Sequence, residues 1–167
     1  MNPLLAVEGL RVSFDTPRGR ARAVDGIDFT LHANEVVCVV GESGCGKSVT
    51  ALSIMGLLAQ PPAVVEGSIR FQAQQLNGLS RRSLEDLRGD RMAMIFQEPM
   101  TSLNPAHRVG DQLAEALIRH RDTPRAEARA AALDMLHRVR IPAAEDRLND
   151  YPHQLSGGMR QRVMIAM

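Results

Sequence analysis

Residues 41–48, GESGCGKS, combine three glycines, a lysine and, directly after it, a serine at a spacing that can bind phosphate. Glycine can take positive φ angles and lets the backbone approach a ligand without a Cβ in the way. Successive N–H groups then form a nest for an anion, and a following helix adds the positive end of its dipole. Lys47 can reach the β- and γ-phosphates, and the Ser48 hydroxyl can bind Mg²⁺. The loop therefore predicts a nucleotide site, and the alternative is a glycine-rich turn that matches by chance.

Contiguous residues of this loop are expected to form the nucleotide site together. The predicted contacts are Gly41, Glu42, Ser43, Gly44, Cys45, Gly46, Lys47, Ser48 and Val49. Lys47 is the single lysine among 20 basic residues, and every other one is arginine. A compact ammonium fits a phosphate cradle better than a planar guanidinium, which supports a specific role for this lysine. Cys45 is interpreted as a neutral filler of the loop and Cys38 as a small buried apolar residue.

The segments on both sides of the loop match the structural context that a phosphate loop requires. Residues 35–41, EVVCVVG, form a short β-branched run that predicts a strand buried on both faces. A helix is expected from Lys47 to Ala59, ended by Pro61 and Pro62. The uncharged stretch 48–65 approaches the length of a membrane span, but the two prolines favour a core helix followed by a loop.

The remaining segments alternate between strand-like and helix-like patterns. Strands are predicted at residues 4–14, 23–31, 67–72 and 92–97, with a solvated hairpin tip at 15–22 and a short polar helix at 80–88. Beyond Pro105, the Ala/Leu/Arg-rich segments 109–121 and 124–140 place apolar residues at helical spacing. A last helix is expected to start at Ser156, Gly157 and Gly158 and to continue to residue 167.

A second anion-binding helix start is suggested by Leu155–Met159, LSGGM. Ser156 is a good N-cap, and the two following glycines allow close approach of a ligand to the backbone. This segment has no lysine, so alone it would bind phosphate weakly. Taken by itself, the pentapeptide is explained better by a capped helix after a loop.

The two glycine motifs together resemble the nucleotide-binding subunit of ATP-binding cassette (ABC) transporters. In that family, LSGG is the signature motif, and the resemblance implies that Ser156, Gly157 and Gly158 contact ATP held by the phosphate loop of a second subunit. It also implies that Gln97 touches Mg²⁺ or the attacking water, although a solvated glutamine at a strand end is the simpler reading. Phe14 stands where an aromatic ring stacks on adenine in the family, with core packing as the alternative.

The resemblance extends over essentially the whole chain. Its most detailed match is to one branch of the ABC family. The segments FQEPMTSLNP (residues 96–105) and YPHQLSGGMRQRVMIAM (residues 151–167) are similar to ATPases of bacterial dipeptide, oligopeptide and glutathione importers. This implies an α/β fold of the P-loop NTPase (ABC ATPase) type with an antiparallel β subdomain and an inserted α-helical subdomain. The implied division is a catalytic core at residues 1–99, a helical subdomain at 100–158 and a helix returning to the core at 159–167.

The same resemblance implies cofactors, partners and a location. ATP and Mg²⁺ are the expected cofactors. The expected partners are integral membrane permease subunits, a second ATP-binding subunit and, indirectly, an extracytoplasmic solute-binding protein. The expected location is the cytoplasmic face of the bacterial inner membrane. A net charge of +1 without a basic stripe argues against nucleic acid, and so against a soluble ABC-type ATPase of DNA repair.

Several parts of the family pattern have no counterpart in these 167 residues: the Walker B aspartate, the adjacent glutamate, the D-loop and the switch histidine. The family places them beyond the LSGG motif, together with central strands of the sheet. We therefore interpret the chain as incomplete at its C-terminus, able to bind nucleotide and unable to hydrolyse ATP at a useful rate. An ATPase assay of the 167-residue chain should give little turnover, and a rate like that of the family would contradict this interpretation.

Overall fold

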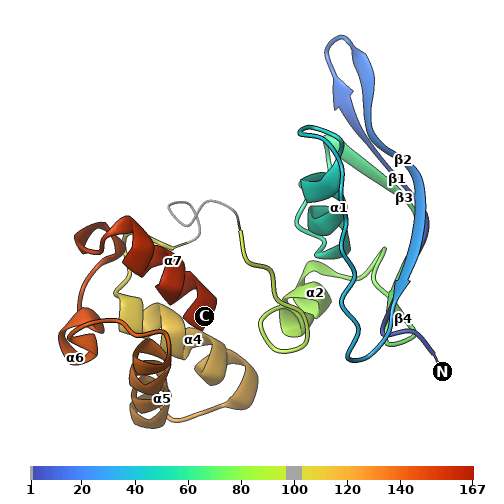
Figure 1. Cartoon of the computed structure of the whole chain (residues 1–167). Helices are drawn as coiled ribbons and strands as arrows, with labels where there is room; N and C mark the ends of the chain where they lie inside the picture. Colours follow the sequence, from blue (N-terminus) through green and yellow to red (C-terminus); the bar gives the residue numbers. More distant parts are fainter. Residues whose placement is uncertain (1, 97–102) are drawn as a thin grey trace. The chain divides into compact units, whose positions relative to one another are not determined.

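The computed structural model describes residues 2–96 and 103–167. The chain divides into two compact units, Met1–Glu85 and Asp86–Met167 (Figure 1). The predicted site residue Gln97 lies outside the described residues.

The first unit is built on a four-stranded antiparallel sheet with the order β2-β1-β3-β4 (Figure 1). Its strands are β1 (Leu5–Thr16), β2 (Gly19–Leu31), β3 (Ala63–Phe71) and the short β4 (Gln74–Gln75). The predicted strands at 4–14, 23–31 and 67–72 are confirmed, but β1 extends to Thr16, β2 begins at Gly19 and β3 begins at Ala63. The hairpin between β1 and β2 is tighter than predicted, because Thr16 already pairs with Gly19. The Thr16 Oγ1 hydroxyl donates to the Gly19 carbonyl at 2.6 Å and closes this turn.

One face of the sheet forms the core of this unit. Residues of β1 that are almost completely buried include Val7, Leu10 and Val12, and Ile69 of β3 is buried beside them. Helix α1 (Lys47–Ile54) makes contacts with both β1 and β2 (Figure 1). The helix that follows the glycine loop is therefore supported by the sheet, which fixes where the loop can lie.

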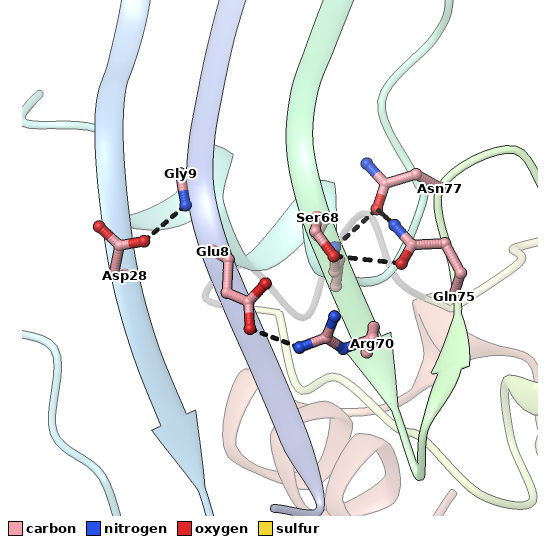
Figure 2. Close-up of polar contacts among 8 residues, drawn as sticks. Glu8, Gly9, Asp28, Ser68, Arg70, Gln75 and Asn77 are labelled. Atoms are coloured by element: carbon pink, nitrogen blue, oxygen red, sulfur yellow. Dashed lines mark hydrogen bonds and ion pairs between the residues drawn. The ribbon is translucent and has the colours of Figure 1, made fainter.

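A bulge interrupts the pairing of β1 with both neighbours between Glu8 and Arg11. Gly9 has a φ of 56° there, and its N–H donates to Asp28 Oδ1 at 2.6 Å (Figure 2). The Asp28 side chain thus replaces the backbone partner that Gly9 loses at the bulge. On the other side of β1, the side chains of Glu8 and Arg70 form an ion pair (Figure 2).

Asp28→Ala is expected to lower the free energy of unfolding by about 1–2 kcal/mol, because the Gly9 N–H loses its acceptor. Chemical denaturation measures this change. Asp28→Asn keeps an oxygen at the same place and should lie within about 0.5 kcal/mol of the wild type. Equal losses in both variants would mean that the charge of Asp28, and not its bond to Gly9, stabilises the bulge.

A small polar network joins β3 to the turn after β4. The Asn77 Oδ1 atom accepts from the Ile69 N–H at 2.8 Å and from the Gln75 side chain at 3.1 Å (Figure 2). Ser68 Oγ donates to Gln75 Oε1 at 3.1 Å. These bonds extend the edge of the sheet beyond the two residues of β4.

The predicted helix at 47–59 is confirmed in type but ends early, at Ile54. The N–H of Gly56 donates to the Ser53 carbonyl at 3.0 Å and the N–H of Leu57 to the Leu52 carbonyl at 2.8 Å. This is a Schellman end with Gly56 at a φ of 60°. The helix therefore stops at a left-handed glycine and not at Pro61 and Pro62. Within the described ranges, no helix combines the length and apolar character needed to cross a bilayer.

Two predicted strands do not form. Residues 35–41 have no regular structure, and Val36 and Val40 are 88% and 87% exposed instead of buried on both faces. In the segment predicted at 92–97, Met92 forms one isolated bridge with Arg88, and residues 93–96 have no regular structure. A buried parallel strand needs hydrogen-bonded neighbours, and the described part of the chain pairs none with either segment. For the same reason Cys38, predicted to be buried, is exposed.

The second unit is helical. Helix α2 (Arg81–Leu87) crosses the division between the units, and the helices beyond it are α4 (Val109–Arg121), α5 (Arg125–Arg138), α6 (Ala144–Arg147), the 3₁₀ helix η1 (Pro152–Gln154) and α7 (Gly157–Ala166). The helices predicted at 80–88, 109–121, 124–140 and from 156 onward are confirmed, and α6 and η1 were not predicted. The core of this unit contains Val109, Leu136 and Val163, one from each of three helices, and none of the three is exposed.

Candidate functional site

The glycine loop is irregular from Gly41 to Gly46 and passes directly into α1. Gly44 and Gly46 have φ angles of 82° and 95°, in the region that residues with a Cβ rarely adopt. Gly46 is the N-cap of α1 and has no side chain to cap it. The loop thus needs glycine at two of the positions that the sequence motif specified.

Gly46 also lies against the sheet. A Cβ at this position would come within 2.5 Å of the Ala23 carbonyl oxygen on β2. The Thr50 hydroxyl donates to the Gly46 carbonyl at 3.1 Å from the first turn of α1, and Thr50 is buried. Because backbone touches backbone here, β2 sets the position of the loop. Ala23 and Thr50 were not predicted as site residues, and only the place of Thr50 four residues after Gly46 hints at its contact.

Lys47 turns back over the loop that precedes it. Its Nζ atom donates to the carbonyls of Gly41 and Glu42, both at 2.7 Å, and lies 3.5 Å from the Cys45 Sγ atom. A Cβ on Gly41 would come within 2.6 Å of the Cys45 sulfur, so Cys45 packs across the loop. Loop carbonyls therefore hold the Lys47 ammonium. An anion that enters the loop could replace these carbonyls as the acceptor of its hydrogen bonds.

The N–H groups at the start of α1 are available to a ligand. Within the part of the chain that the structure describes, the amides of residues 46–49 donate to no other protein group. Such amides at a helix start carry partial positive charge and suit an anion. The Ser48 side chain is exposed next to them. The described residues contain no cluster of three or more His, Cys, Asp or Glu side chains that could hold a metal ion.

The second predicted anion site is at the start of α7. Ser156 is the N-cap, and its hydroxyl accepts from the Met159 N–H at 3.3 Å. Gly157 and Gly158 are exposed, and a Cβ on either would meet nothing within 4 Å. The fold of this unit therefore does not itself require glycine at these two positions.

The remaining predicted contact, Phe14, lies on β1 and is half-buried. It pairs with Ala21 on β2 and Ala63 on β3. The first unit thus contains Phe14 and the whole glycine loop, whereas Ser156, Gly157 and Gly158 belong to the second unit.

A glycine loop that leads into a helix, with one lysine folded over it, defines the site of a phosphate-loop protein. The family model described as "ABC transporter" matches residues 24–167. This chain therefore belongs to the ABC transporter family, and its fold is that of an ABC ATPase cassette.

Solved structures support the fold. The dimeric cassette MJ0796, in a post-hydrolysis state bound to ADP and Pi, is similar with a TM-score of 0.84 and 26% identity, over 97% of this chain and 67% of that one. The chain cbiO1 of the cbiONQ complex from Clostridium perfringens is similar with a TM-score of 0.68 and 27% identity, over 99% of this chain and 61% of that one.

Relatives of known name are ATP-binding proteins of peptide transport. The dipeptide transport ATP-binding protein DppD of Bacillus subtilis is 51% identical over 100% of this chain and 50% of its own length. The oligopeptide transport ATP-binding protein OppD of Salmonella typhimurium is 51% identical over 99% of this chain and 49% of its own length. The chain spans about half the length of these curated relatives.

Proposed function

We propose that this chain is the ATP-binding part of a motor subunit that drives import of peptides or a related small solute through a membrane permease. The observation that carries the proposal is the Lys47 ammonium, 2.7 Å from the carbonyls of Gly41 and Glu42, beside amides that donate to no protein group among residues 2–96 and 103–167. The names of DppD and OppD, each about half identical to the chain, support a peptide-type solute.

ATP is proposed to lie along the loop from Gly41 to Val49, with the phosphates on the free amides and against Lys47. The residues present fit such a ligand. Gly41 and Gly46 are already in close contact with Cys45 and Ala23, so the loop keeps its curvature only with glycine there. Charged hydrogen bonds from Lys47 and the amides stabilise the negative phosphate oxygens, and this stabilisation grows with the charge on the phosphate.

Mg²⁺ is proposed to accompany ATP, with the exposed hydroxyl of Ser48 as one ligand and Gln97 as the second residue near it. Mg²⁺ takes oxygen ligands and neutralises charge on the β- and γ-phosphates when it is bound. Phe14 is proposed to stack on the adenine ring, since one part of its side chain remains accessible.

The start of α7 is proposed to act on nucleotide held by a second ATP-binding subunit. Ser156, Gly157 and Gly158 present a helix N-terminus without a lysine, so the cation must come from the partner's loop. Glycine has no role in packing at positions 157 and 158, which supports a requirement from outside the unit. The similar cassette MJ0796 is a dimer in its post-hydrolysis state, in agreement with a paired arrangement.

The proposed setting follows from the importer relatives. The subunit would lie at the cytoplasmic face of the bacterial inner membrane, in contact with permease subunits and indirectly with an extracytoplasmic solute-binding protein.

We keep the proposed division into a core at 1–99, a helical subdomain at 100–158 and a returning helix at 159–167. Peptide transport in the relatives' names favours this function over an ATPase of DNA repair.

Gly158→Ala tests this proposal in the intact protein. Alanine favours the helix by up to about 1 kcal/mol over glycine, so thermal unfolding should be unchanged or slightly improved. ATP-dependent pairing of subunits should be lost, because the new Cβ lies where the partner's nucleotide must approach. Sedimentation with and without ATP measures pairing.

Gln161→Ala is the matched control, since Gln161 is an exposed residue on the same helix. This variant should pair as the wild type does. Normal ATP-dependent pairing by Gly158→Ala would contradict the role proposed for the start of α7.

A further inference from the structure

The first turn of α7 has little to hold it in place through packing. Gly157 and Gly158 have no side chains and are exposed, so only the half-buried Met159 packs against the core from this turn. The buried face of the helix begins at Val163, which packs into the core of the second unit. Two glycines at a helix start also cost conformational entropy. With one apolar side chain packing from this turn, its orientation depends strongly on polar contacts.

Arg162 supplies such a contact one turn further along the helix. Its Nε–H donates to the Gly158 carbonyl at 3.3 Å. Its Nη1 atom donates to the Val139 carbonyl at 3.3 Å and also to the Arg140 carbonyl. One guanidinium therefore connects the first turn of α7 with the segment that follows α5.

The acceptors on the α5 side form a rigid helix end. The N–H of Arg140 donates to the His137 carbonyl at 2.9 Å and that of Ile141 to the Leu136 carbonyl at 3.0 Å. This is a Schellman end, with Arg140 in the left-handed region at a φ of 56°. Leu136 and Ile141 are buried in the core, which anchors the turn. Carbonyls at a helix C-terminus carry partial negative charge, so a guanidinium binds them well.

Arginine is suited to this position because its donors point in fixed and different directions. Nε faces Gly158 on the same helix while Nη1 faces the α5 end. A lysine has a single point charge on a flexible stem and cannot hold both sides in a fixed geometry. The Arg162 guanidinium thus ties the Gly158 carbonyl to the end of α5, next to the buried Leu136 and Ile141.

We propose that Arg162 is a positioning residue that holds the first turn of α7 at a fixed orientation to the end of α5. It acts through Gly158 and touches no nucleotide of its own subunit. This inference rests on the proposed function, in which the start of α7 meets the partner's ATP. Without the link, the turn would sample other orientations and meet that nucleotide less often.

The test compares Arg162→Met, Arg162→Lys and the control Gln161→Met in the intact protein. Arg162→Met is expected to lower ATP turnover at saturating ATP by about tenfold, as for loss of one charge-assisted hydrogen bond. The KM for ATP should stay within about twofold, because the subunit's own phosphate loop is unchanged. Arg162→Lys should fall between Arg162→Met and the wild type. Gln161→Met changes an exposed neighbour and should behave as the wild type.

Amide hydrogen exchange separates positioning from general destabilisation. In Arg162→Met, exchange should accelerate at the Met159 and Arg160 amides, which donate to Ser156, and remain unchanged in α4. Faster exchange throughout the second unit, or turnover and exchange both like the wild type, would overturn the proposal. Failure of the proposed function has a different signature: the wild type itself would show no ATP-dependent pairing, while the exchange result would still report on the Arg162 link.

Discussion

Lys47→Ala is expected to weaken ATP binding by roughly ten- to a hundredfold. In the structure the ammonium is held by two carbonyls of the loop at 2.7 Å, where a triphosphate would offer stronger, charged acceptors. Loss of a hydrogen bond between charged groups costs about 1.5–3 kcal/mol, which corresponds to this range of affinity. Titration calorimetry with ATP and the intact protein measures the change.

A comparison of ATP, ADP and AMP binding tests whether the effect of Lys47→Ala comes from contact with the outer phosphates. The loss should be largest for ATP, smaller for ADP and nearly absent for AMP, because Lys47 reaches only the outer phosphates. Arg18→Ala removes one positive charge from the β1–β2 hairpin and serves as the control, with ATP affinity close to that of the wild type. Equal ATP affinities for Lys47→Ala and the wild type would remove Lys47 from the site.

Gly46→Ala is expected to have the largest effect on the first unit. The substitution forces a Cβ to within 2.5 Å of the Ala23 carbonyl and places alanine at a φ of 95°. Left-handed strain costs about 1–2 kcal/mol and overpacking about 1–3 kcal/mol. The sum predicts a loss of roughly 2–5 kcal/mol in the free energy of unfolding, measured by chemical denaturation, together with loss of ATP binding.

Gly44→Ala is the matched control for this contact. Gly44 has a similar φ of 82°, but a Cβ there meets nothing within 4 Å. The variant should show only the strain of the backbone, about 1–2 kcal/mol. If the two variants lost the same stability, the contact between the loop and β2 would contribute nothing, and only the φ angles would matter.

The helices of the second unit were predictable because their signal is local. In α4, the limits Val109 and Arg121 agree with the prediction, since apolar residues recur along one face over several turns. The end of α1 was missed because Gly56 was not interpreted as a left-handed cap, although the residue type is the usual signal.

The two missing strands show where local patterns fail. Val36–Val40 has the β-branched composition of a buried strand, yet these residues are irregular and mostly exposed. Composition favours an extended backbone, but a strand forms only when another strand accepts its hydrogen bonds. No residue within the run reports whether that neighbour is present.

The sequence by itself determined the glycine loop that leads into α1, because Gly41, Lys47 and Ser48 belong to one continuous segment. It likewise determined the Ser156 cap of α7, which needs only the amide of Met159. The tertiary structure alone decided that Gly46 touches Ala23 and that Arg162 joins Gly158 to Val139. Ala23 lies 23 residues from Gly46 and Val139 lies 23 residues from Arg162 along the chain, and only folding brings such pairs together.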